Sequence, residues 1–267
     1  MNNNIDSSDF SIVVDAGGFA KGRSSFSDLQ NQYLLGGLEK LGYSVINLST
    51  RDFQIGAEFL QELDQQHEFD FISANAVYSD SDELFTNNII YRKLDVQGTG
   101  RVVPFRHITI GFLGLCDERG RLTYSRMQDE TENSVELKSI DPVNVAVELV
   151  PQMQRKADLV VLLFNGKLQT VEAIADQIDG IDIVIMGGEY YRASSYNRHS
   201  PILATTPSLG KYGAMLTLEL DKNYQIVNIQ RQRQALSEKV PDNPELAEWV
   251  SEFERKKKEQ IQQQMAN

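Results

Sequence analysis

The chain has 267 residues, of which 41% are hydrophobic and 24% charged, and a formal net charge of -12. This length and composition predict a soluble folded protein with one sizeable core. The acidic balance argues against a nucleic acid polymer as partner, because a polyanion needs a basic surface. No apolar run approaches the roughly 20 residues of a membrane span. The single cysteine, Cys116, excludes an intramolecular disulfide.

Residues 1–9 are expected to be a disordered N-terminus, followed by one domain over 10–242. Apolar periodicity and turn signals in the first half of this domain alternate between strand and helix. The expected strands are 10–14, 45–48 and 69–75, and the helices between them are 28–41 and 55–63. Residues 77–106 are predicted to form an irregular segment with an edge strand at 88–92. The pattern is that of a layered α/β core.

The alternation resumes after this irregular segment. Strands are expected at 108–115, 160–163 and 181–186, with helices at 141–156 and 171–177. Three further strands follow one another directly, at 201–206, 213–220 and 225–229, and predict an antiparallel part. Residues 243–267 form an amphipathic helix and tail whose apolar side carries Leu246, Trp249, Val250 and Phe253. Two mixed sheets packed face to face, with helices outside, are the expected fold.

Small and polar residues follow four of these strands, where α/β sheets collect their ligand-handling groups. The segments are Asp15-Ala16-Gly17-Gly18, Ser49-Thr50-Arg51-Asp52, Asn165-Gly166-Lys167 and Gly187-Gly188-Glu189-Tyr190-Tyr191. In order and spacing they resemble the calcineurin-like metallophosphoesterase domain of bacterial 5′-nucleotidases. The resemblance implies a four-layer αββα sandwich. It also implies that the opening strand of the family, with its Asp-x-His, and the C-terminal substrate domain are missing.

The same resemblance implies that the metal-binding residues are replaced. Gly18 stands where the family has its metal-bridging Asp, and Thr50 where it has an Asn ligand. Arg51 stands at the catalytic His, and Asn165 at a His ligand. Glu189 and Tyr191 replace two further histidines. The three histidines present, His67, His107 and His199, are expected at the surface or at strand edges.

These replacements favour a pseudo-enzyme that binds no metal or other cofactor. Such a protein would work by binding a small anionic ligand or a protein partner. Arginine cannot act as a base at neutral pH, and Thr50, Asn165 and Gly18 offer at most neutral oxygens. The degenerate cleft is expected to comprise Asp15, Gly18, Thr50, Arg51, Asp52, Asn165, Lys167, Glu189 and Tyr191.

Two alternatives remain open on the sequence alone. Asp15, Asp52, Asn165 and Glu189 could hold one Mg²⁺ or Ca²⁺ in a rebuilt phosphoester hydrolase, with Arg51 and Lys167 on the phosphate. Alternatively, the cleft binds a phosphorylated molecule without turnover through Arg51, Lys167 and Tyr191. The compartment is open as well: cytoplasmic as written, or periplasmic if a leader has been removed.

Overall fold

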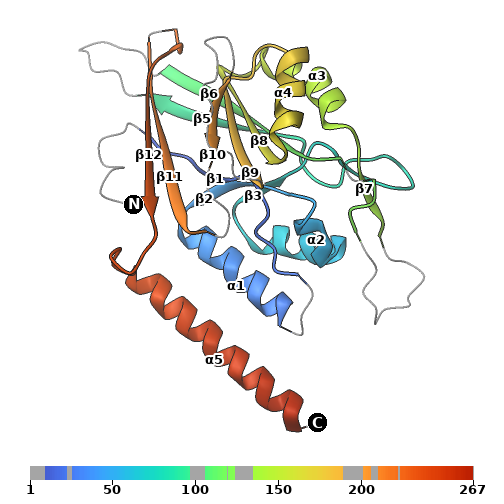
Figure 1. Cartoon of the computed structure of the whole chain (residues 1–267), viewed down its shortest axis with the longest axis vertical. Coiled ribbons are helices and arrows are strands. Elements are labelled where there is room, and N and C mark those ends of the chain that lie inside the picture. Colours follow the sequence, from blue (N-terminus) through green and yellow to red (C-terminus); the bar gives the residue numbers. More distant parts are fainter. Residues whose placement is uncertain are drawn as a thin grey trace.

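The computed structural model describes residues 10–22, 26–96, 106–118, 120–123, 135–188, 201–205, 210–221 and 223–266. The expectation for residues 1–9 lies outside this part of the chain. Two sheets occupy the middle of the molecule, with α1 and α2 on one side and α3 and α4 on the other (Figure 1). The expected αββα layering is therefore confirmed.

The first sheet is parallel, in the order β1-β2-β3. Its strands are β1 (Val13–Asp15), β2 (Tyr43–Asn47) and β3 (Asp70–Ile72). They are connected by α1 (Ser27–Lys40), the short 3-10 helix η2 (Asp52–Ile55) and α2 (Ala57–Gln66). The sequence predicted one helix starting at residue 55. Gly56 separates η2 from α2 instead, because its φ of 104° is open to glycine and costly for other residues.

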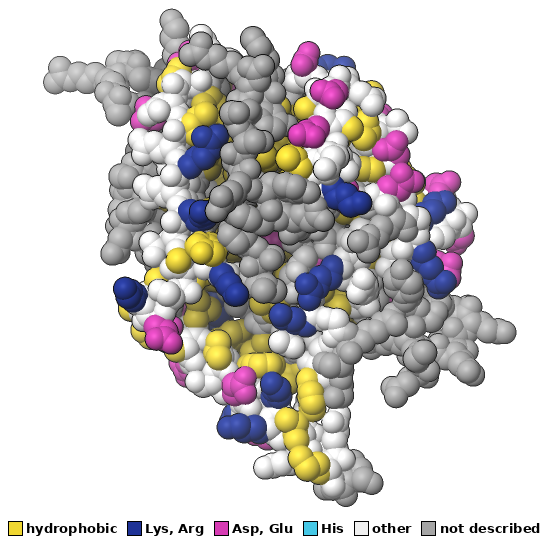
Figure 2. All heavy atoms as spheres, viewed as in Figure 1, with side chains coloured by type: hydrophobic (Ala, Val, Ile, Leu, Met, Phe, Trp, Pro, Cys, Tyr) yellow, Lys and Arg dark blue, Asp and Glu magenta, His cyan; other side chains and the backbone are white. Residues whose placement is uncertain are grey.

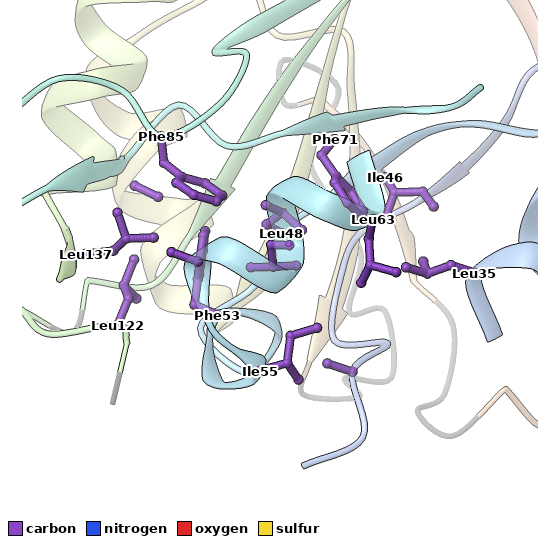
Figure 3. Close-up of a cluster of buried hydrophobic side chains, with 14 of the residues drawn as sticks. Leu35, Ile46, Leu48, Phe53, Ile55, Leu63, Phe71, Phe85, Leu122 and Leu137 are labelled. Carbon is purple, nitrogen blue, oxygen red and sulfur yellow. The ribbon is translucent and has the colours of Figure 1, made fainter. Parts of the chain in front are cut away.

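A large hydrophobic cluster fills the space between this sheet, η2 and the two helices (Figure 3). Leu48 and Phe53 are 0% exposed, and Phe71 is 1% exposed. The ring of Phe53 meets the ring of Phe85 edge-on at 5.7 Å. Burying each such side chain contributes about 1.5–3 kcal/mol. The cluster therefore fixes η2 against the sheet, immediately beside the turn that follows β2.

The second sheet has five strands in the order β10-β9-β8-β6-β5. The strands are β5 (Ile89–Val96), β6 (Arg106–Cys116), β8 (Leu159–Gly166), β9 (Ile183–Gly188) and β10 (Ile202–Thr205). Only β5 is antiparallel to its neighbour, and it lies at the edge as predicted. The sequence assigned β10 to an antiparallel part, but it pairs in parallel with β9. Residues 189–201 are long enough for the crossover of about a dozen residues that a parallel pair requires.

Helices α3 (Pro142–Met153) and α4 (Leu168–Gln177) cover the outer face of the second sheet. The Asp141 side chain accepts a hydrogen bond from the backbone N–H of Val143 at 2.9 Å, and Pro142 is the first helical residue. An aspartate N-cap followed by proline at the first helical position is a favourable helix start, and the helix lies within the predicted range 141–156.

A separate apolar cluster lies between the two sheets and includes Val45, Ile72, Ile108 and Leu163. Beside it, Asn47 at the end of β2 donates from Nδ2 to the carbonyl oxygens of Ala16 and Leu115, at 3.1 and 2.9 Å. One amide thus ties both sheets together at the carboxyl ends of their strands. The strand-end turns are anchored to a rigid interface.

Three smaller elements complete the described chain. Strand β4 (Ala76–Tyr78) pairs with β7 (Leu137–Ser139), and β11 (Tyr212–Leu220) forms an antiparallel ribbon with β12 (Ile226–Ala235). Helix α5 (Pro244–Ala266) packs along α1 (Figure 1). Trp249 contacts α1, whereas Val250 points outward and is 56% exposed, unlike the apolar side predicted for this helix.

Candidate functional site

The turns that follow β1, β2 and β8 and the end of β9 come together at one end of the two sheets. Asn165 and Gly187 are paired across β8 and β9. A Cβ placed on Gly187 would lie 3.3 Å from Cβ of Ala16 and 3.4 Å from the carbonyl oxygen of Gly17. The second sheet therefore touches the turn after β1. This juxtaposition is the one that the strand-end residues predicted.

Two glycines make the turn after β1 possible. Gly17 and Gly18 both have a φ of 93°, a conformation that other residues rarely adopt. A Cβ on Gly17 would lie 2.7 Å from the carbonyl oxygen of Asn47, and one on Gly18 would lie 3.2 Å from Nδ2 of Asn165. The turn is packed closely against both β2 and β8.

Asp52 lies at the start of η2 and is 0% exposed. Its Oδ2 accepts hydrogen bonds from the backbone N–H of Gly18 at 2.7 Å, the backbone N–H of Ser49 at 2.8 Å and the Ser49 hydroxyl at 2.7 Å. Its Oδ1 accepts from the backbone N–H of Ala20 at 2.8 Å. Burial raises the pKa of Asp52, while these donors oppose the rise. Both carboxylate oxygens are already bonded within the protein.

Asp15 is the second carboxylate of the site and is partly exposed. Its Oδ1 accepts a hydrogen bond from the backbone N–H of Gly17 at 2.6 Å. Burial raises the pKa of Asp15 to about 6; the Gly17 bond lowers it, and the negative charge of Asp52 adds to the rise. Burial, together with the charge of Asp15, also raises the pKa of Tyr43.

Asn165, at the end of β8, links the second sheet to the turn after β1. Its Nδ2 donates to the carbonyl oxygen of Gly17 at 2.7 Å. A carbonyl can only accept, so the nitrogen of this amide, and not its oxygen, faces the turn after β1. The amide acts here as a hydrogen-bond donor to the backbone.

Lys167 and Arg51 are both exposed, and Thr50 is partly buried. The backbone N–H of Lys167 donates to Oδ2 of Asp117 at 3.0 Å, and the hydroxyl of Thr170 donates to Oδ1 of the same carboxylate at 2.8 Å. Asp117 therefore caps the start of α4. The sequence reasoning missed Asp117, although it directly follows β6 and so satisfies the strand-end criterion.

Sequence reasoning also missed Ser49, which supplies two of the four donors to Asp52. The Ser-x-x-Asp spacing of Ser49 and Asp52 was the available signal, since it is a variant of the spacing found in capping boxes. Glu189 and Tyr191, which were expected in the same cleft, lie outside the described residues.

Two of the three histidines are described. His67 stacks on Phe69 and contacts Glu39 at 3.1 Å, with a side chain only 10% exposed. His107 pairs with Asp95 at the end of the β5–β6 pair. Both are distant in the fold from the strand-end turns. Cys116 is buried.

No family model matches the chain. It is 24% identical over 197 residues to a 2′,3′-cyclic-nucleotide 2′-phosphodiesterase/3′-nucleotidase of Haemophilus influenzae, covering 66% of this chain and 29% of that protein. It is 22% identical over 209 residues to the trifunctional nucleotide phosphoesterase YfkN of Bacillus subtilis, covering 69% of this chain and 14% of that protein.

Solved structures of calcineurin-like phosphoesterases and nucleotidases resemble this chain over most of its length. The calcineurin-like phosphoesterase YfkN from Bacillus subtilis superposes with a TM-score of 0.73 at 16% identity, covering 98% of this chain and 88% of that one. A 5′-nucleotidase precursor from Thermus thermophilus gives a TM-score of 0.68 at 15% identity, with 94% and 50% covered. The chain has the calcineurin-like phosphoesterase fold. The resemblance inferred from the strand-end motifs is confirmed, and the chain spans less than a third of the curated relatives that it matches.

The described residues of this site do not form the ligand set that a two-metal centre needs. Within the described ranges, no three His, Cys, Asp or Glu side chains lie close enough to share a metal ion. Both oxygens of Asp52 are occupied by protein donors, and Asn165 directs its nitrogen at Gly17. Gly18 has no side chain to bridge two ions. The described part of the chain also has no helix long and apolar enough to cross a membrane.

Proposed function

We propose that this calcineurin-like phosphoesterase-fold protein does not hydrolyse phosphoesters and works by binding. One observation carries the proposal. Asp52 and Asn165, two of the side chains that the sequence offers as ion ligands, are instead bonded to the protein: Asp52 accepts from three N–H groups and a hydroxyl, and Asn165 donates to Gly17.

The chemistry of the fold supports this proposal. Two-metal hydrolysis needs ions about 3.5–4 Å apart that activate a hydroxide and stabilise the developing charge. Gly18 offers no ligand atom. The position aligned with the catalytic base holds Arg51, and arginine does not act as a base at neutral pH. Among the residues that the structure describes, the site therefore offers neither a set of metal ligands nor a base.

A small anionic ligand or a protein partner is the proposed occupant, and two exposed cations favour the first. Arg51 and Lys167 each follow a strand that ends at the converging turns. On the face seen in Figure 2, Lys and Arg side chains are spread among neutral atoms, and acidic side chains gather over α3 and α4. This distribution suits a ligand with one or two negative charges better than a polyanion.

Metal content and turnover test the proposal together. The chain should be purified after exposure to Mn²⁺, Mg²⁺ and Zn²⁺, and assayed against a phosphomonoester, a phosphodiester and nucleoside monophosphates. The calcineurin-like phosphoesterase YfkN serves as the active control. We expect substoichiometric metal and no metal-dependent turnover. Two ions per chain with turnover would contradict the proposal.

One bound Mg²⁺ or Ca²⁺ with turnover that is lost in Asp15→Asn would identify the rebuilt single-metal hydrolase instead. Asp15 is the described carboxylate that such a site would use, because both oxygens of Asp52 already accept hydrogen bonds from protein donors.

Ligand binding is tested by thermal shift with nucleoside monophosphates and inorganic phosphate. A shift that disappears in Arg51→Ala and Lys167→Ala, but persists in Lys239→Ala, supports the anionic ligand. Lys239 is a matched control because it is an exposed lysine in the segment between β12 and α5. A shift unchanged in all three variants would place the ligand elsewhere, and no shift would favour the protein partner.

A further inference from the structure

The Asp52 carboxylate lies in a ring of donors drawn from two separate turns. Gly18 and Ala20 belong to the turn after β1, and Ser49 to the turn after β2. The four bonds measure 2.7 to 2.8 Å, and the partners lie 34, 32 and 3 residues away from Asp52. Distances this short are typical of charged acceptors.

Cationic side chains do not balance this carboxylate. Among the ion pairs between described residues, none includes Asp52. Among the described residues, its hydrogen-bond donors are three backbone N–H groups and one hydroxyl. Successive N–H groups that converge at a turn form a concavity that binds anions, as in many phosphate sites. The positive φ of Gly17 and Gly18 directs the turn into this shape.

We propose that the turns after β1 and β2 form a built anion site, and that its resident anion is the chain's own Asp52 carboxylate. The site takes an oxyanion of carboxylate size. Asp52 acts as a positioning residue: by accepting hydrogen bonds from both turns on one side chain, it keeps the ends of β1 and β2 together. The inference does not depend on whether the protein hydrolyses phosphoesters.

The chemistry of the ring requires two acceptor oxygens with no hydrogens. An asparagine at position 52 would supply one oxygen and would turn an NH₂ group toward N–H donors. An alanine would leave three buried N–H groups and the Ser49 hydroxyl without an acceptor, which destabilises a protein for each group left unpaired. The same alanine opens a space of the size and polarity of a formate ion.

Chemical rescue tests the proposal in the full chain. Asp52→Ala is unfolded with urea in sodium formate, sodium acetate and sodium chloride at equal ionic strength. We expect a folding equilibrium constant at least tenfold below that of the unaltered protein in chloride. Formate should raise the folding equilibrium constant of Asp52→Ala at least threefold above its value in chloride. The rise should depend on the formate concentration, as for any ligand that binds the folded state.

Asp182→Ala is the matched control. The Asp182 carboxylate accepts a hydrogen bond from the backbone N–H of Val160 at 2.7 Å, and no second donor to it is found among the described residues. We expect no formate-specific recovery in this variant or in the unaltered protein. A folded Asp52→Ala that responds equally to formate and chloride would overturn the proposal.

If Asp52→Ala does not fold, Asp52→Asn and Ser49→Ala decide the matter. Asp52→Asn keeps the volume but not the second acceptor, so its folding equilibrium constant should fall at least tenfold. Ser49→Ala removes one donor of four and should cost less than Asp52→Asn. An Asp52→Asn variant as stable as the unaltered protein would contradict the role assigned to the anion.

Discussion

The side-chain amide of Asn165 donates a hydrogen bond to the carbonyl oxygen of Gly17 at 2.7 Å, across 148 residues of sequence. It joins the end of β8 in one sheet to the turn after β1 in the other. The bond joins two neutral groups, a side-chain amide and a backbone carbonyl. The strength of this bond can be measured directly.

Asn165→Ala should lower the free energy of unfolding by about 1–2 kcal/mol, because it leaves the Gly17 carbonyl without this donor. Asn165→Asp should cost more, since it turns a carboxylate oxygen toward that carbonyl. Urea unfolding measures both. Gln169→Ala, at an exposed position of α4, is the control and should change the value by less than about 0.5 kcal/mol. Equal stabilities for Asn165→Ala and the control would show that the bond contributes nothing.

Restoring an acidic side chain at the bridging position should not restore a metal centre. Gly18→Asp would place a side chain at a φ of 93° and its Cβ 3.2 Å from Nδ2 of Asn165. Forcing a non-glycine residue into this region costs about 1–2 kcal/mol. We expect a destabilised protein with no Mn²⁺-dependent phosphodiester hydrolysis. Turnover in this single variant would mean that the remaining residues still form a metal site.

Asp15 should make the protein less stable at neutral pH than at mildly acidic pH. Burial, opposed by the Gly17 N–H and aided by the charge of Asp52, raises the pKa of Asp15 to about 6, above the 3.8 of the unfolded chain. The folded state therefore binds the proton more tightly. The penalty for ionising Asp15 is complete above pH 6 and disappears as the pH falls toward 4.

Asp15→Asn removes this penalty and keeps an acceptor for Gly17. Each pKa unit corresponds to about 1.4 kcal/mol, and partial exposure reduces the effect. The variant should be about 1–2 kcal/mol more stable at pH 7.5, with the difference vanishing near pH 4. Asp52 and Tyr43 face the same region, so the comparison uses the difference between the two proteins at each pH. A difference that grows as the pH falls would contradict the assignment.

The layers and the converging turns could be predicted from the sequence because strand ends carry local signals. Glycine pairs and polar residues follow β1, β2, β8 and β9, and parallel strands bring their carboxyl ends together. What the side chains do there could not be predicted. Asp52 was assigned as a candidate metal ligand, yet both of its oxygens are taken by donors up to 34 residues away. Such contacts depend on how the turns meet, which no local pattern encodes.

The strand order showed the same limit. Apolar alternation located β10, but the neighbour of a strand depends on the path of the connection before it. Because three strands followed one another, an antiparallel arrangement was expected for all of them. It holds for β11 and β12 and fails for β10, which pairs in parallel with β9.

Helix α1 contains two adjacent glycines, Gly36 and Gly37. Trp249 of α5 packs on this pair, and its Nε1 donates to the carbonyl oxygen of Tyr33 at 2.8 Å. A Cβ on Gly36 would lie 2.6 Å from Cζ2 of the indole, whereas the nearest Trp249 atoms to a Cβ on Gly37 are 3.8 Å away. Gly36→Ala should therefore displace α5, and Gly37→Ala should be tolerated.

The emission of Trp249, the only tryptophan of the chain, reports the outcome. In Gly36→Ala the emission should shift to the red and α5 should become sensitive to protease, because the indole can no longer pack against α1. In Gly37→Ala the emission should be unchanged, and the protein should gain up to about 1 kcal/mol, because alanine is a better helix former than glycine. Identical spectra for the two variants would mean that α5 is not held in place by the close fit of Trp249 on Gly36.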